Sequence, residues 1–381
     1  MKKAFILTLA AAFVVALSAS AWAGVPGANV EFGARINQEI GWDSKSKEQT
    51  TNKVDDVSRS YLRTNSNSYL SAKFASKDKA QGAYVELGIG SGALGTNTIS
   101  TRHAYGWYKV GNCTLLAGHT DNLFGGAYWG TQKLMAEKFS GDILGWGKAW
   151  APRRAQVQLQ YEASKNIKLM FALARPKTDG SPTGISTTNL DKYYTIPQLE
   201  VAAQFKFANI SVTPSAGWYR AEFKKVASGY DDKVDSWGLI LPVHAVFGAF
   251  DVMAEIHYTQ NPANMFDSYS TTEANAYMKK SGSLEDTKNV GGFLQLGYKV
   301  ATSHITVGAG YESFTNDAWK SDAGYKDDNT TRKMFWVSVP TKVGQNLWLY
   351  PEFDYYDYDK NANDVDQGNE WVLGLLFRFL F

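Results

Sequence analysis

The last segment of the chain, EWVLGLLFRFLF, places apolar residues at every second position. The apolar residues of one parity are Trp371, Leu373, Leu375, Phe377, Phe379 and Phe381. The other parity includes Glu370, Gly374 and Arg378. Successive side chains of a β-strand point to opposite faces, so this spacing predicts a strand with one apolar face and one mixed face. A helix would need apolar residues three and four positions apart.

The same alternation recurs along the chain, for example in 154–162, 250–258 and 347–355. The sequence contains about sixteen such segments, and each is predicted to form a strand. Their expected ranges are roughly 30–42, 60–74, 81–90, 100–110, 113–119, 152–162, 166–174, 196–207, 209–223, 234–246, 249–259, 289–300, 303–313, 331–341, 346–357 and 370–381. The sequence therefore predicts an all-β protein.

The connections between these strands alternate between short and long ones. Short connections such as Gly111-Asn112 and Ala208-Asn209 carry residues that favour tight turns. The long connections lie around 43–59, 91–99, 120–151, 175–195, 224–233, 260–288, 314–330 and 358–369. Short turns at one end and long loops at the other are typical of a transmembrane antiparallel β-barrel with both chain ends on the short-turn side.

A barrel in a membrane has to close, because hydrocarbon offers no water to hydrogen-bond a free sheet edge. The last segment is therefore expected to pair with the first strand and to face lipid with its apolar side. A soluble β-sandwich or a large lipid-free barrel would also alternate. Aromatic residues at the ends of predicted strands favour the membrane barrel, because its interfaces carry aromatic girdles. These residues are Trp42, Trp218, Tyr258, Tyr311, Tyr355 and Trp371.

The first residues have the layout of a secretory signal peptide, with two lysines, an apolar run and small residues before a cleavage site after Ala23. We expect residues 1–23 to be removed and residues 24–381 to form a single β-barrel domain. Loss of Lys2 and Lys3 would lower the basic count from 39 to 37, which equals the 37 acidic residues. This balance gives no indication of nucleic-acid binding. The single cysteine, Cys113, excludes an internal disulfide.

After the signal peptide, the whole chain resembles the sixteen-stranded porins of bacterial outer membranes. The most specific element is the C-terminal segment, which ends on Phe381 and looks like the signal that porins present to the barrel assembly machinery. The resemblance implies a homotrimer in the outer membrane of a Gram-negative cell, in contact with lipid and lipopolysaccharide. It also implies short periplasmic turns, long extracellular loops, and passive diffusion of small hydrophilic solutes and ions without a cofactor.

In that family the third long loop folds into the pore and sets acidic groups across from basic residues of the wall. Here that loop runs from Asp121 to Ala151, and its glycines permit sharp reversals. Its charged candidates for the pore constriction are Asp121, Lys133, Glu137 and Asp142.

The basic candidates on the pore wall are arginines of the predicted strands. The inward parity selects Arg35, Arg63, Arg154 and Arg378, whereas the alternation around Arg102 does not choose a face. Facing rows of opposite charge would create a field that orients dipolar solutes. Each arginine could instead be a hydrated lumen residue or pair with a glutamate of the wall.

Motifs for catalysis or cofactor binding are weak. Residues 90–95 satisfy G-x-G-x-x-G, but a dinucleotide site needs a helix to begin there, and the following residues are predicted to form a strand. The five histidines are scattered, and His257, with Asp251 and Glu255 on the same face, is the nearest approach to an acid–base cluster. No Cys/His spacing indicates a metal site.

The sequence therefore predicts a porin that passes small hydrophilic solutes and is not an enzyme. Because basic lumen residues favour anions, a channel selective for organic acids is the first alternative. A barrel enzyme and a structural or adhesive barrel are further alternatives.

Overall fold

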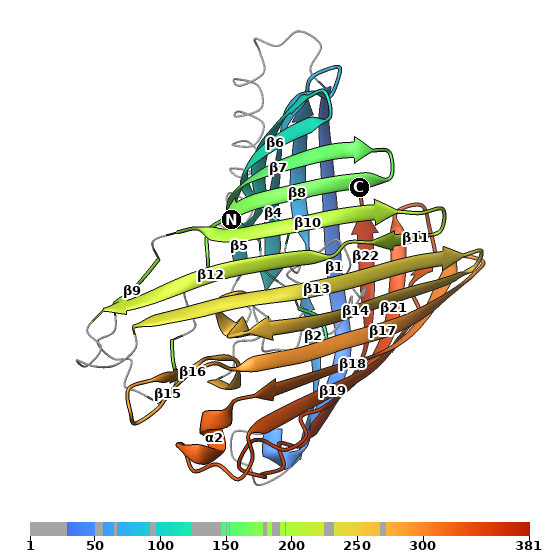
Figure 1. Ribbon diagram of the computed structural model, residues 1–381. Coiled ribbons are helices and arrows are strands. Elements are labelled where there is room, and N and C mark those ends of the chain that lie inside the picture. Colours follow the sequence, from blue (N-terminus) through green and yellow to red (C-terminus); the bar gives the residue numbers. More distant parts are fainter. Residues whose placement is uncertain are drawn as a thin grey trace.

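The chain forms one antiparallel β-sheet that closes on itself as a sixteen-stranded barrel (Figure 1). The structure is a computed structural model. It describes residues 29–49, 56–64, 67–91, 97–123, 146–149, 151, 153–177, 181–184, 191–194, 196–224, 232–266 and 272–381. The expected signal peptide, residues 1–23, lies outside the described residues.

Most barrel strands are continuous. They are β1 (Asn29–Lys45), β4 (Gln81–Ser91), β5 (Asn97–Val110), β6 (Cys113–Thr120), β7 (Arg154–Ser164), β8 (Ile167–Ala174), β13 (Lys233–Phe247), β14 (Phe250–Gln260), β17 (Lys288–Val300), β18 (Ser303–Thr315), β21 (Leu347–Asp357) and β22 (Asn369–Leu380). The others consist of two pieces: β2 (Val57–Thr64) with β3 (Tyr69–Ala75), β9 (Asp191–Tyr193) with β10 (Gln198–Lys206), β11 (Ile210–Val212) with β12 (Ser215–Lys224), and β19 (Asn329–Ser338) with β20 (Thr341–Lys342). Each predicted segment coincides with one barrel strand, so the predicted fold is confirmed.

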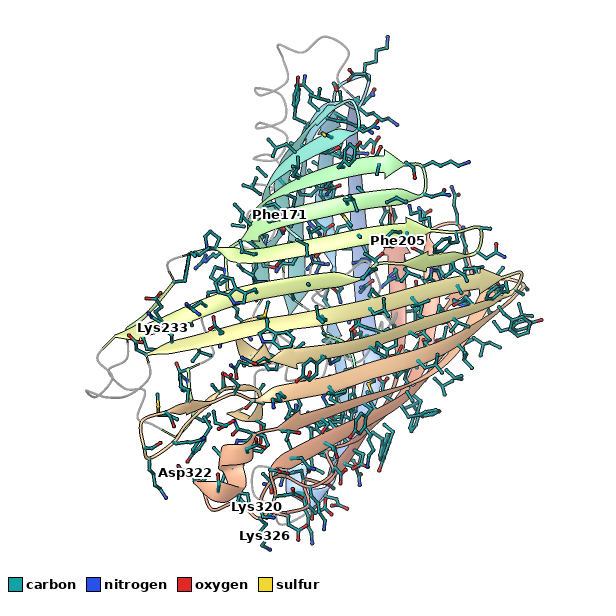
Figure 2. The ribbon with its side chains drawn as sticks, in the orientation of Figure 1. Phe171, Phe205, Lys233, Lys320, Asp322 and Lys326 are labelled. Carbon is teal, nitrogen blue, oxygen red and sulfur yellow. The ribbon has the colours of Figure 1, made fainter. Side chains whose placement is uncertain are left out.

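The two faces of the wall differ as the alternation predicts. On β1, Asn37 and Glu39 are completely buried on the inner face, whereas Phe32 and Trp42 are 60% and 50% exposed on the outer face. Figure 2 shows outward side chains such as Phe171 along the wall and places the charged Lys320 and Asp322 at the long-loop end. The apolar outer face is the surface that suits contact with lipid.

Aromatic residues of the outer face gather near both ends of the barrel. Toward the loops, the rings of Trp237 and Tyr258 lie 5.4 Å apart between centroids. Toward the turns, Phe250 and Tyr298 lie 4.6 Å apart. Such rows suit the interfaces of a membrane, where one end of a ring meets hydrocarbon and the other meets water.

The short turns contain residues in the left-handed backbone region, which glycine adopts without strain. Gly111, between β5 and β6, has a φ of 56°, and Gly248, between β13 and β14, has a φ of 62°. At the opposite end, the loop from β14 to β17 contains the short hairpin of β15 (Tyr277–Met278) and β16 (Leu284–Glu285), and the next loop contains helix α2 (Asp317–Ser321). Short 3-10 turns cover η1 (Lys47–Gln49), η3 (Pro262–Asn264) and η4 (Thr272–Ala274).

A hydrophobic cluster at the loop end joins several of the long loops. It brings Ala149 and Ala151 of the third long loop together with Met265, Phe266 and Trp319 of later loops. These side chains are at most 2% exposed, so the cluster fixes the loops to one another. Among the described residues, no helix is long and apolar enough to cross a bilayer.

Closure of the barrel joins its first and last strands. β1 pairs with β22 in a continuous antiparallel register from Arg35 opposite Leu380 to Lys45 opposite Glu370. Beyond β22, the backbone of Phe381 exchanges hydrogen bonds with Ala34 at 2.9 and 3.0 Å. The last segment is the closing strand, as predicted, while the role of Phe381 in assembly stays a prediction.

A charged side chain on the lipid-facing wall should lower the free energy of unfolding strongly at mid-strand and only slightly near the membrane interface. Leu294 of β17 is 50% exposed on the outer face. We expect Leu294→Arg to lower the free energy of unfolding by about 2–4 kcal/mol, and Tyr258→Arg, in the loop-side aromatic row, by only about 0–1 kcal/mol. Urea unfolding of the protein in lipid vesicles measures both values. Equal losses for the two variants would contradict a lipid-facing outer wall.

Candidate functional site: the charged inner wall

The described end of the third long loop lies inside the barrel against the far wall. The backbone N–H of Gly147 donates to Glu312 Oε1 of β18 at 2.6 Å, and that of Ala149 donates to Glu255 Oε1 of β14 at 2.8 Å. The indole ring of Trp146 packs edge-on against Tyr356 of β21. We call residues 146–149 the anchor segment, because wall carboxylates and rings hold it across the lumen.

Gly147 is required where the anchor segment meets the wall. Its φ of 87° lies in the region that other residues avoid, and a Cβ there would collide with the backbone carbonyl of Gly292. The next residue, Lys148, is 1% exposed. Burial lowers the pKa of Lys148 to about 8, while the nearby carboxylates of Glu255 and Asp121 oppose this shift by favouring the charged amine.

Three arginines from separate strands meet on the inner wall near the junction of the first and last strands. The guanidinium carbons of Arg35 (β1) and Arg102 (β5) lie 4.5 and 5.7 Å from the centroid of the Tyr69 ring. Arg378 (β22) lies 4.7 Å from the Tyr350 ring. We call Arg35, Arg102 and Arg378 the arginine cluster.

The cluster carries more positive charge than its neighbours neutralise. Arg102 forms an ion pair with Glu86 at 2.5 Å. Arg35 donates to the carbonyl of Asn67, and Arg378 donates to Asn37 and to the Tyr350 hydroxyl. Within the described part of the chain, no carboxylate forms an ion pair with Arg35 or Arg378. Among the described residues, this part of the wall therefore has more arginines than carboxylates paired with them.

A β-bulge explains why the alternation of apolar and polar residues did not indicate whether Arg102 faces the lumen or the lipid. The register between β4 and β5 shifts between Glu86 and Leu87, so that Glu86 faces His103 and Leu87 faces Thr101. The extra residue, Arg102, turns its side chain to the inner face, where it reaches Glu86 and Asn67. A bulge re-aims a side chain in this way by breaking the two-residue period locally.

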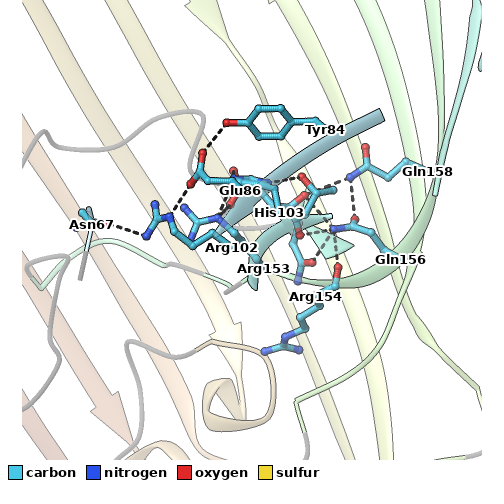
Figure 3. Close-up of polar contacts among 12 residues, drawn as sticks. Asn67, Tyr84, Glu86, Arg102, His103, Arg153, Arg154, Gln156 and Gln158 are labelled. Atoms are coloured by element: carbon cyan, nitrogen blue, oxygen red, sulfur yellow. Dashed lines mark hydrogen bonds and ion pairs between the residues drawn. The ribbon is translucent and has the colours of Figure 1, made fainter. Parts of the chain in front are cut away.

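A second charged group follows at the root of the third long loop (Figure 3). Arg153 forms an ion pair with Asp121 at 3.1 Å and donates to His103 Nε2 at 3.0 Å. Asp121 is thus paired on the same side as the arginine cluster. Sequence reasoning missed Arg153, because it precedes β7 and its parity is opposite to that of the inward Arg154.

The other two predicted arginines, Arg63 and Arg154, also face inward, but their guanidinium groups bind neighbouring residues. Arg63 forms an ion pair with Glu39 at 2.8 Å, which neutralises its charge. Arg154 donates to Gln198 and to the Met265 carbonyl, and Figure 3 shows it pointing away from Arg102. Lys133, Glu137 and Asp142 lie outside the described residues, so an acidic row facing the arginines stays a prediction.

The remaining sequence candidates lie in the wall. His257 contacts Asn289 and Glu255 and is 4% exposed. The G-x-G-x-x-G motif at 90–95 falls partly outside the described residues, and strand β5 follows it at Asn97, as predicted. Across the described ranges, no group of three or more His, Cys, Asp or Glu side chains could hold a metal ion.

The fold is shared with solved outer-membrane channels. The outer membrane channel DcaP of Acinetobacter baumannii matches at a TM-score of 0.69 and 15% identity, over 93% of this chain and 98% of that one. The anion-selective porin from Comamonas acidovorans matches at 0.60 and 12%, over 93% and 100%. The trimer form of OmpT, an outer membrane protein of Vibrio cholerae, matches at 0.55 and 14%, over 93% and 100%. No protein-family model and no curated protein matches the sequence.

A closed antiparallel barrel with an apolar outer belt and a polar, charged inner wall is a transmembrane β-barrel. Its sixteen strands, with the described end of the third long loop inside the barrel, give it the architecture of the bacterial outer-membrane porins.

Proposed function

We propose that the chain is a passive diffusion channel for small hydrophilic solutes and ions across the outer membrane of a Gram-negative cell. The observation that carries this proposal is the polar inner wall of a sixteen-stranded barrel. Barrels of this size leave an aqueous lumen. Buried polar residues line the inside of most strands, among them Asn37, Glu86, Gln156, Gln158, Asp251, Gln295 and Glu352. The anchor segment narrows this lumen and sets the size of solutes that pass.

We further propose a homotrimer with the short turns in the periplasm, the long loops outside the cell, and the outer wall against lipid and lipopolysaccharide. A trimer form exists for the Vibrio cholerae protein that shares the fold. Removal of residues 1–23 and insertion by the barrel assembly machinery belong to the same proposal. Diffusion needs neither a catalytic group nor a cofactor.

The arginine cluster favours anions among the permeating solutes. Arg35 and Arg378 come from neighbouring strands and donate hydrogen bonds to neutral partners, and no carboxylate of the described residues forms an ion pair with either. An anion that passes this wall meets a positive potential in a narrow aqueous path. We therefore propose a preference for anions, including small organic acids.

Liposome swelling tests the channel itself. Vesicles that contain the purified, folded protein should swell in neutral sugars at rates that fall steeply with sugar size, because the anchor segment limits the aperture. Vesicles with heat-unfolded protein provide the baseline. Folded protein that admits no sugar would contradict the channel and favour a plugged structural barrel or a barrel enzyme.

A further inference from the structure

A run of aromatic rings lines the inner wall on the turn side of the arginine cluster. The ring centroids of Tyr84 and Tyr105 lie 5.8 Å apart, and those of Tyr105 and Trp107 lie 6.1 Å apart. His103 continues the run toward Arg153, with its ring 5.7 Å from Tyr84. These rings are half-buried, so their accessible faces meet the lumen.

The wall is built so that Trp107 lies flat. Gly82 of β4 is the cross-strand partner of Trp107, and a Cβ at Gly82 would collide with the indole ring. The indole N–H donates to the carbonyl of Lys79 in the adjoining turn at 3.3 Å, which fixes the edge of the ring. A ring that covers a glycine in this manner turns its π-face away from the wall, where a second ring can stack on it.

The rings border a cavity of about 320 Å³, which has the size of a small-molecule site. Lys73, Thr114 and Gln160 supply its polar rim. Gln160 donates to Gln158, the next residue of a buried glutamine row, at 2.8 Å. Among the described residues, neither the side-chain amide oxygen of Gln160 nor the Thr114 hydroxyl has a hydrogen-bond partner. In the part of the chain that the structure describes, the ammonium group of Lys73 forms one ion pair, with the exposed Glu31 at 3.3 Å.

We propose that this aromatic pocket is a binding site for small aromatic carboxylates, which extends the proposed anion channel and rests on it. Tyr105 and Trp107 would stack on the ring of the solute. Lys73 and the Thr114 hydroxyl would bind its carboxylate, since an ion pair with an exposed glutamate is weak and readily exchanged. The Tyr84 hydroxyl donates to Glu86, the ion-pair partner of Arg102, so the arginine cluster adjoins the pocket and would raise the local concentration of anions. A neutral sugar would stack on the rings but has no negative charge to pair with these cations.

Equilibrium binding of 2-naphthoate to the detergent-solubilised, folded protein tests the proposal. The matched ligand is decahydro-2-naphthoate, which has the same charge and no aromatic ring. Fluorescence anisotropy reports naphthoate directly, and displacement reports the saturated acid. We expect naphthoate to bind about fivefold more tightly, since two rings stack on it.

Variants assign this preference to the pocket. Tyr105→Leu with Trp107→Leu should abolish the preference for naphthoate, and Tyr105→Phe with Trp107→Phe should keep most of it. Tyr108→Leu is the matched control, because Tyr108 is 55% exposed on the outer face of the same strand. Equal affinity for the two acids, or an unchanged preference in the double leucine variant, would overturn the proposal. Displacement of naphthoate by trehalose but not by the saturated acid would also overturn it, in favour of a sugar site.

Single-channel current in potassium chloride, recorded on the same preparations, separates this inference from the proposed function. A silent barrel that still prefers naphthoate would contradict the channel and leave the pocket in place. A conducting barrel that does not distinguish the two acids would contradict the pocket alone.

Discussion

Replacing Arg35 and Arg378 by glutamine should lower the chloride-to-potassium permeability ratio at least about tenfold. At about 5 Å in water, a unit charge changes the energy of a passing ion by about 0.8 kcal/mol, with opposite sign for chloride and potassium. Each arginine therefore changes each permeability about fourfold before screening by salt. No described carboxylate forms an ion pair with either side chain, so neither charge is directly neutralised. The reversal potential of bilayers in a potassium chloride gradient measures the ratio.

The controls for this experiment are arginines whose charge is already paired. Arg220→Gln removes a guanidinium that is bound to Asp235 at 2.7 Å and 44% exposed. Arg63→Gln removes the guanidinium that pairs with Glu39 and leaves that carboxylate on the inner wall, so it should shift selectivity toward cations by the amount expected for one lost positive charge rather than two. If Arg220→Gln changed the ratio as much as the cluster variant, the cluster would not be the selective element.

Substitution of Gly147 should widen the pore. Gly147→Ala adds a Cβ that collides with the Gly292 carbonyl and forces a side chain into a φ of 87°. Strain of this kind costs about 1–3 kcal/mol before the collision is counted. The anchor segment should therefore leave the wall, giving up the hydrogen bonds to Glu255 and Glu312, and unit conductance in single-channel recordings should rise.

Gly111→Ala is the matched control for this variant. Gly111 also has a positive φ, 56°, but nothing lies within 4 Å of the added Cβ. It should strain a turn without altering conductance. An unchanged conductance in Gly147→Ala, with the barrel folded, would show that the anchor segment does not set the aperture.

The strands were predictable because a membrane barrel imposes a simple rule on its sequence. Lipid outside and water inside require alternating side chains along every strand. The burial of β1 alternates from Asn37 to Asp43, and that of β22 alternates from Asn369 to Phe379. The inward directions of Arg35 and Arg378 followed from the same rule. Closure between the first and last strands followed from the need to satisfy a free edge.

The site was only partly predictable, because it depends on departures from the rule. Arg102 enters the lumen through a bulge, and no residue pattern in the sequence marks that register shift. Arg153 precedes β7, whereas the alternation over the predicted strand 152–162 assigns it to the face opposite Arg154. The anchoring of Gly147 by Glu312 joins residues 165 positions apart, and only the closed barrel brings them together. A glycine-rich loop of the right length was the only signal available for this contact.

Single-channel recording of the unmodified protein in a salt gradient tests the central claim most directly. We predict stepwise current insertions in groups of three, with a reversal potential whose sign shows that chloride is more permeant than potassium. Open channels that favour potassium would contradict the role of the arginine cluster. A folded barrel that carries no current would contradict the channel.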